Sequence, residues 1–254
     1  MLVGVAALAG ACGRSGFDPR LGGSADAAPA ADGTPLDAPP PVAFDGAASA
    51  KLPCPGSCDP ATLTWIDTVT MTGHDVAVVV GVTWASTTPT LPSIASITFG
   101  GSPMTLIGSQ VVSDQEIAQY VLVDPPRGAQ TVSVMFSGGI TAGGAIGGAV
   151  SFTGVDPISP TGTFVAASGF GTLASVTVAS AEGSMVIDAL DFDTDVTVVA
   201  AGIGQTPEWN LLGASGQEPT GAGSLRAGAP SVVMSWSGNI ADNWAVGAVS
   251  VNAR

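Results

Sequence analysis

The densest group of carboxylates in the sequence lies between residues 188 and 195. Asp188 is followed by Asp191, Asp193 and Asp195, and the last three occupy alternate positions. Alternate residues of an extended strand point to one face, so these three carboxylates would lie together. Carboxylate oxygens are the ligands that Ca²⁺ prefers, although the glycine and the closing glutamate of an EF-hand loop are missing here. A calcium site and a solvated strand end both fit this spacing.

Catalytic groupings are sparse. His74 is the only histidine and sits in a turn-like Thr72–Asp75 segment, so any Ser-His-Asp triad would have to use it. A Gly-x-Ser-x-Gly elbow is absent. Glycosidase chemistry needs two facing carboxylates, and no local motif singles out a pair among the four glutamates. The sequence therefore favours a protein that is not an enzyme, with a hydrolase as the least favoured alternative.

Exposed aromatic rings are the usual platforms for sugars. Trp84 precedes the loop-like segment ASTTPTLP, and Trp209 lies in TPEWN, so these two are the candidate ligand-binding residues. Trp65, Trp236 and Trp244 sit in strand-like patterns and are expected in the core. The alternative for Trp84 and Trp209 is also burial, because large aromatic residues usually pack inside.

The amino-terminal residues 1–11, MLVGVAALAGA, are uncharged and apolar, and Cys12 follows them directly. This run is too short to span a bilayer. It has the apolar core and the small final residues of a secretory signal, but it lacks the basic start. A true start upstream of Met1 would explain that omission.

Small residues leading into a cysteine resemble the lipobox of bacterial lipoproteins, with Leu8 one position further back than in the usual motif. The resemblance implies that Cys12 is lipidated and begins the mature chain. Gly13, in place of aspartate, implies sorting to the outer membrane. Several acyl chains make a stable membrane anchor. A plain signal peptide, giving an otherwise secreted or cell-surface protein, is the alternative.

The segment 12–60 is expected to be a tether. Its Gly, Ala, Pro, Asp and Ser residues cannot bury enough apolar surface to offset the entropy of ordering. Near its end, Cys54 and Cys58 enclose Pro-Gly-Ser, which predicts a small disulfide loop in an oxidising compartment. Zinc is less favoured because no second ligand pair accompanies them.

Residues 61–254 have the pattern of an all-β domain. Short apolar or alternating runs such as 76–82, 131–136 and 185–192 are separated by glycine-rich turns. We expect an antiparallel, jelly-roll-like β-sandwich. The formal net charge of −14 argues against binding to nucleic acid, because contacts with phosphates need Lys and Arg.

One stretch of the domain recurs. The segment VMFSGGI at 134–140 is echoed by VMSWSGNI at 233–240, and GAVS occurs at 148–151 and again at 247–250. Met135 and Gly148 are as far apart as Met234 and Gly247. A hairpin used twice would explain the matching distances, which suggests two related halves.

The domain resembles an uncharacterised sandwich module of secreted bacterial proteins that often stands beside lectin-like or Ig-like modules. The resemblance rests on VVVGVTW (78–84), SITFGG (96–101), LIGSQ (106–110), YVLVDPPRG (120–128), AVSFTGVD (149–156) and AGIGQT (201–206). It implies the fold and an extracytoplasmic location, and carries no reaction. Its likeness to jelly-roll carbohydrate-binding modules is an analogy of fold.

The sequence thus predicts a lipid-anchored surface protein that displays a binding or adhesion module for polysaccharide or another surface protein. A structural surface or assembly protein without a small ligand is the alternative. The first reading requires exposed aromatic groups near polar ones, and the second requires an open strand edge or an apolar patch.

Overall fold

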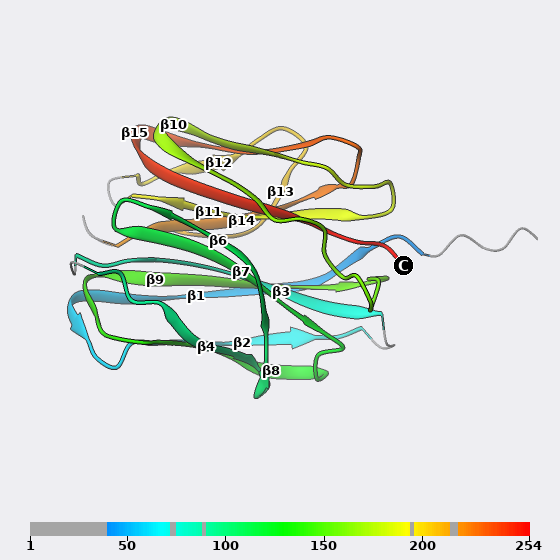
Figure 1. Ribbon diagram of the computed structural model, residues 1–254, viewed down its shortest axis with the longest axis horizontal. Coiled ribbons are helices and arrows are strands. Elements are labelled where there is room, and N and C mark those ends of the chain that lie inside the picture. Colours follow the sequence, from blue (N-terminus) through cyan, green and yellow to red (C-terminus); the bar gives the residue numbers. More distant parts are fainter. Residues whose placement is uncertain (1–39, 72–74, 88–89, 194–195, 214–217) are drawn as a thin grey trace, which may run out of the picture. The chain divides into compact units, whose positions relative to one another are not determined.

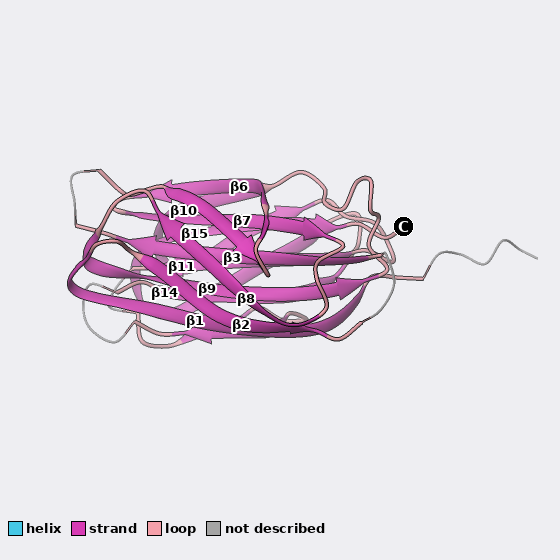
Figure 2. Cartoon of the chain, turned by 90° about the horizontal axis from the view of Figure 1, so that it is seen from below, coloured by secondary structure: helices cyan, strands magenta, loops and turns pink. Residues whose placement is uncertain are grey.

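The computed structural model describes residues 40–254 except 72–74, 88–89, 194–195 and 214–217. All secondary structure in these residues is β, and the sheets are antiparallel, which confirms the expected sandwich (Figures 1 and 2). The strands are β1 (Ala43–Cys58), β2 (Thr62–Val69), β3 (Val76–Ala85), β4 (Ile94–Phe99), β5 (Ser102–Pro103), β6 (Thr105–Val112), β7 (Gln115–Val123), β8 (Gly128–Phe136), β9 (Ile140–Thr153), β10 (Val165–Val178), β11 (Met185–Phe192), β12 (Val199–Ala201), β13 (Thr206–Leu211), β14 (Thr220–Ala227) and β15 (Val232–Val251).

Strands β1–β9 form the amino-terminal half, which is a two-layer sandwich. Its inner sheet has the order β1-β9-β3-β7-β6, and its outer sheet has the order β2-β8-β4-β5. All ten residues of β3 are buried, because both faces of the inner sheet are covered. Strand β2 alternates instead: Leu63, Trp65 and Val69 point into the core while Thr64 and Thr68 face solvent. The hydroxyl-rich composition thus belongs to the outer faces.

Strands β10–β15 form the carboxy-terminal half, a single sheet ordered β10-β15-β11-β14-β13, with β12 also paired to β15. The register of β10 against β15 shifts between Gly171 and Leu173. Beyond this point the two strands fold over the rest of the sheet. Val178, Met234 and Trp236 therefore pack against Leu190 and other residues of the same sheet in a core of its own.

The two halves share one topology. In the amino-terminal half, β3 pairs with β7 and β9, β6 pairs with β7, and β4 pairs with β8. In the carboxy-terminal half, β11 pairs with β14 and β15, β13 pairs with β14, and β12 pairs with β15. Strand β15 therefore corresponds to β8 and β9 joined in series, and β10 to β1 and β2. The chain contains one sandwich built twice, giving four layers (Figure 1).

The repeat predicted from the sequence is present, but its register differs by one residue at the methionines. Met135 is half-exposed on the outer face of β8, whereas Met234 is fully buried. Because side chains alternate along a strand, the buried counterparts are Val134 with Met234 and Phe136 with Trp236. The GAVS segments are true counterparts: Gly148 lies opposite Gly81, and Gly247 lies opposite Ala189.

The halves pack with the inner sheet of the amino-terminal half against β11, β13, β14 and β15, which we call the inner layer of the carboxy-terminal half, and equivalent residues meet each other. A Cβ on Gly81 would lie 2.9 Å from the Cβ of Ala189, its own counterpart. Thr83 Oγ1 likewise donates a hydrogen bond of 2.5 Å to Oδ1 of Asp191, which occupies the same position in β11. Contact between equivalent positions is the mark of a two-fold relation, here within one chain.

Two aromatic side chains fill the space between the inner sheet and the inner layer. Trp209 lies over Gly148, where a Cβ would come within 2.4 Å of the indole. Phe164, from the segment that joins the halves, lies over the counterpart Gly247, where a Cβ would come within 2.5 Å of the ring. These glycines are required because any side chain would occupy the place of the aromatic ring.

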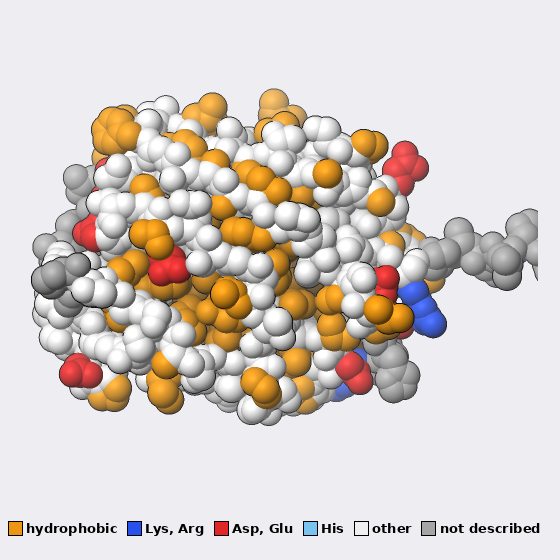
Figure 3. Space-filling model, viewed as in Figure 1, with side chains coloured by type: hydrophobic (Ala, Val, Ile, Leu, Met, Phe, Trp, Pro, Cys, Tyr) orange, Lys and Arg blue, Asp and Glu red, His pale blue; other side chains and the backbone are white. Residues whose placement is uncertain are grey.

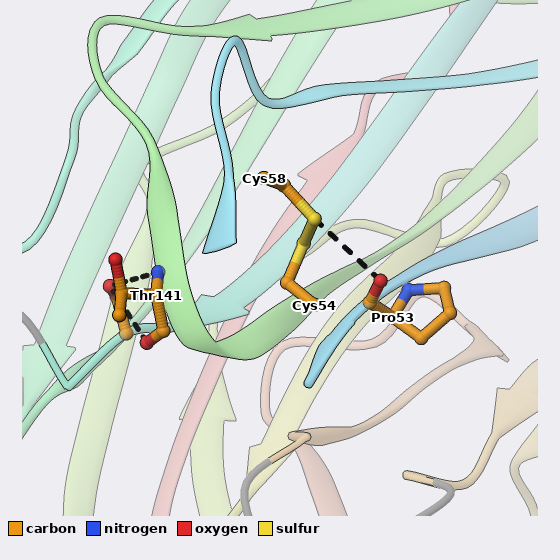
Figure 4. Close-up of a disulfide and its surroundings, with 5 residues drawn as sticks. Pro53, Cys54, Cys58 and Thr141 are labelled. Atoms are coloured by element: carbon orange, nitrogen blue, oxygen red, sulfur yellow. Dashed lines mark hydrogen bonds between the residues drawn. A yellow bond between two sulfur atoms is a disulfide. The ribbon is translucent and has the colours of Figure 1, made fainter. Parts of the chain in front are cut away.

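The expected tether is shorter at its carboxyl end than the range 12–60, since β1 begins at Ala43 and pairs with β9 as far as Cys58. The folded part therefore starts before the predicted residue 61, and the rest of the expected tether lies outside the described residues. The predicted Cys54–Cys58 disulfide is present at the end of β1, near Thr141 (Figure 4). It closes the last turn of an ordered edge strand rather than a loop in a linker.

Candidate ligand-binding groove

A groove of about 420 Å³ opens at the edge of the junction between the halves, beside β13. Phe44 of β1 comes from the amino-terminal half, and its ring is 40% exposed. The remaining lining comes from the carboxy-terminal half: Met185, Gly204, Thr206, Glu208, Leu225, Arg226 and Ala227. The groove therefore combines an apolar floor and an aromatic ring with three polar side chains.

The charges in the groove are not paired with each other. Arg226 Nη1 donates to the Val233 carbonyl at 2.8 Å, and no carboxylate of the described residues lies within ion-pair distance of this guanidinium. Burial raises the pKa of Glu208 above its usual value. Charged side chains are few on the molecule and lie mostly toward its two ends on the face in Figure 3. Arg226 thus keeps donors for an acceptor group on a ligand.

A buried polar network lies behind the groove wall. Asp188 of β11 is fully buried in the carboxy-terminal core, where it accepts hydrogen bonds from Ser224, Trp236 and Gln205. Gln205 stands between the groove residues Gly204 and Thr206. Burial raises the pKa of Asp188 to about 7, and the hydrogen bonds from Trp236 and Ser224 oppose that shift.

Two of the three aspartates of the expected calcium site are described, and Asp191 does not lie on an exposed face. Asp191 is fully buried between the halves, and Asp193 Oδ2 accepts a hydrogen bond from Asn243 Nδ2 at 3.4 Å. Asp195 lies outside the described residues. Within the described ranges, no three Asp, Glu, His or Cys residues are grouped closely enough to hold a metal ion. Burial raises the pKa of Asp191 well above its usual value, opposed by the Thr83 bond and reinforced by Asp193 and Asp114.

The prediction that Trp84 and Trp209 form an exposed platform is wrong. Trp84 is 1% exposed, packs edge-on against Phe136 and donates from Nε1 to the Pro92 carbonyl. Trp209 is 5% exposed because it fills the glycine-lined junction. The expected burial of Trp65 and Trp236 is confirmed.

Two further candidates, His74 and Cys12, lie outside the described residues. A pair of aspartates that the sequence analysis missed lies near one end of β1. Asp45 accepts hydrogen bonds from Thr70, Ser151 and the Met71 amide, which outweigh the effect of burial and lower its pKa. Asp67 occupies an inward position of β2, and burial raises its pKa to about 6. The only sequence signal for this pair is that Asp67 occupies an inward-facing position in the alternating pattern of β2.

Comparisons with protein-family models, with curated proteins and with solved structures found no match. The described part of the chain also contains no helix that is long and apolar enough to cross a membrane.

Proposed function

We propose that this protein is a non-catalytic saccharide-binding protein of the cell surface, held to the membrane through a lipid on Cys12, and that the groove beside β13 is its binding site. The observation that carries the proposal is the meeting of Phe44 and Arg226 at one groove. An aromatic ring supports the apolar face of a sugar, while a guanidinium and a carboxylate bond its polar groups. Glycoside hydrolysis needs two carboxylates, and Glu208 is the one carboxylate in the lining.

Binding is tested with the whole chain on a glycan array and on insoluble polysaccharides. Phe44→Ala and Arg226→Gln should each weaken binding at least about tenfold, because each removes a central contact. The matched controls are Phe170→Ala, whose ring is 72% exposed on β10, and Arg127→Gln, whose guanidinium pairs with Asp124. Equal affinity in the groove variants and the controls would exclude this groove as the site.

The anchor has a separate test. Cells that make the chain are labelled with an alkyne fatty acid, and the label is compared with that of Cys12→Ser. We expect label and outer-membrane fractionation to be lost together in the variant. Label that persists in Cys12→Ser, or none in the parent chain, contradicts the lipid anchor.

A structural coating role is the second candidate, favoured by the outer sheet of the amino-terminal half. The solvent face of β2 and β8 carries no charged side chain, and consists of Thr62, Thr64, Ile66, Thr68, Ala129, Thr131, Ser133 and Met135. Such a face can approach another negatively charged copy without repulsion. Concentration-dependent assembly in sedimentation velocity, lost in Thr64→Asp, would favour this role over saccharide binding.

A further inference from the structure

The turn at residues 202–205 forms one wall of the groove and is fixed from inside the molecule. The amide of Gly202 donates to the Ser235 carbonyl at 2.8 Å, and the amide of Gln205 donates to the Gly202 carbonyl at 3.1 Å. Gly204 has a φ of +81° and lies under the Arg226 guanidinium, whose atoms are 3.6 Å from the place of a Cβ. This turn therefore packs against Arg226, whose guanidinium also donates to the Val233 carbonyl.

The Gln205 side chain connects this turn to the core. Its Oε1 accepts from the Ser235 amide at 2.8 Å. Its Nε2 donates to Ser224 Oγ at 2.7 Å and to Asp188 Oδ2 at 3.3 Å. This orientation of the amide is fixed by the Ser235 amide, which can only donate.

Asp188 receives donors at both oxygens. Oδ1 accepts from the Ser224 amide at 2.6 Å and from Ser224 Oγ at 2.9 Å. Oδ2 accepts from Trp236 Nε1 at 2.8 Å and from Gln205. The partners come from β14, β15 and the turn, and none is charged; the same-face neighbours on β11, Val186 and Leu190, are apolar. Such a set of donors fits a carboxylate, whereas burial favours the neutral acid.

We infer that Asp188 is a positioning residue for the groove: its carboxylate holds Gln205, and through Gln205 the 202–205 turn against which Arg226 packs, so that the groove binds its ligand with Asp188 ionised and releases it with Asp188 protonated. The release of ligand rests on the proposed function of the groove. The holding of the turn does not.

Protonation changes the network at either oxygen. A proton on Oδ1 can be shared only with Ser224 Oγ, whose own hydrogen then loses Asp188 as its acceptor. Oδ2 faces donors only. A proton on Oδ2 meets Trp236 Nε1 and Gln205 Nε2, and neither can accept it. Gln205 can supply an acceptor only by turning its amide, which places Nε2 against the Ser235 amide and breaks the 2.8 Å bond. The pKa of about 7 places this exchange near neutral pH. In the other half, Val80 occupies the position of Asp188 and offers no such control.

The test follows ¹⁵N-labelled whole chain by NMR from pH 5 to 9. We expect the Trp236 indole N–H and the Gln205 side-chain amide to titrate together near pH 7, with the backbone amides of Gly202 and Gly204 following. Asp188→Asn should abolish this titration. Asp191→Asn should leave it in place, because Asp191 is equally buried on the same strand but points to the junction between the halves.

Titration of the indole without movement of Gly202 and Gly204 overturns the inference, as does a network that does not titrate in this range. A second measurement uses a uronic-acid tetrasaccharide and a neutral glucose tetrasaccharide as probes. Affinity should fall about tenfold from pH 8 to pH 6, following the ionised fraction, and should be pH-independent in Asp188→Asn. Absence of binding at every pH, with the titration intact, contradicts the proposed function of the groove and supports only the holding of the turn by Asp188. Binding without pH dependence overturns the proposed release.

Discussion

The two halves of the molecule share a strand order but differ in what fills their cores. The amino-terminal core has Val80 and Phe136 where the carboxy-terminal core has Asp188 and Trp236. An apolar pair is thus replaced by a carboxylate and an indole that bond to each other at 2.8 Å. A carboxylate is tolerated in a β core when hydrogen-bond donors surround it, because a buried polar group is most costly when it is unpaired.

The junction shows a second difference. Trp209 of β13 fills one side, and its counterpart on β6 is Gly108, whose missing side chain leaves room for Phe164. Similar volume is therefore filled from two different places in the chain. The backbone follows the two-fold relation, while different residues fill the space on the two sides of the junction.

Placing a carboxylate in the amino-terminal core tests the first difference most strongly. Val80→Asp should lower the free energy of unfolding by about 5 kcal/mol at pH 8, because position 80 lies in a hydrophobic core. The loss should be smaller at pH 4, where the new carboxyl is neutral. Urea denaturation measures both values. Val80→Thr, which adds a hydroxyl but no charge, should cost only about 2 kcal/mol; a similar loss in both variants at pH 8 would contradict the argument.

The junction is broken by removing its aromatic residues. Trp209→Ala should cost about 4 kcal/mol, because a buried indole leaves a large cavity over Gly148. Phe164→Ala should cost about 2 kcal/mol, since Phe164 is only partly buried and water can enter its place. Urea midpoints with unchanged slopes measure both losses. A larger loss for Phe164→Ala would contradict the expectation that Trp209 contributes more to stability than Phe164.

The disulfide belongs to the amino-terminal half alone. Cys54→Ser with Cys58→Ser should cost about 2 kcal/mol, the loop-closure entropy of so short a loop. Hydrogen exchange should show the loss first in β1 and β9. Equal loosening of β10 and β15, the corresponding strands, would show that the halves unfold as one unit.

Substitution of Asp191 is expected to have the smallest effect on stability. Its raised pKa means that the folded state holds a proton that the unfolded chain releases near pH 4, so stability falls as the pH rises above that value. Asp191→Asn keeps an acceptor for Thr83 and removes this dependence. Its Tm at pH 8 should exceed that of the parent by a few degrees, equivalent to about 1 kcal/mol. No gain at pH 8, or an equal gain at pH 4, would contradict burial of the charge.

Local pattern was sufficient for much of the fold. The uniform apolar run of β3 and the alternation of β2 and β8 identified buried and half-buried strands. Strand β1 was missed because its side chains are small and show no alternation. It becomes a strand through its partner β9, whose glycines and alanines match it from about a hundred residues away.

The candidate site was less predictable than the fold. Phe44 lay within the supposed tether, and Arg226 lay in an unremarked strand, so only the fold brings them to one groove. Trp84 and Trp209 were wrongly predicted to be exposed, because residues far away in the sequence cover them. The loop-like composition around them did not reveal that Phe136 and Gly148 would bury them.

The long pairing of β1 with β9 has a mechanical consequence. The bonds run from Ala43 opposite Thr153 to Cys58 opposite Ile140, and Pro40 lies just before the first pair of this ladder. Tension applied at Pro40 along the axis of β1 loads these bonds in shear, so that they must fail together rather than open one at a time. The disulfide sits at the far end of the loaded strand and closes its last residues into a loop. A load applied from this end of β1 therefore meets the whole ladder at once.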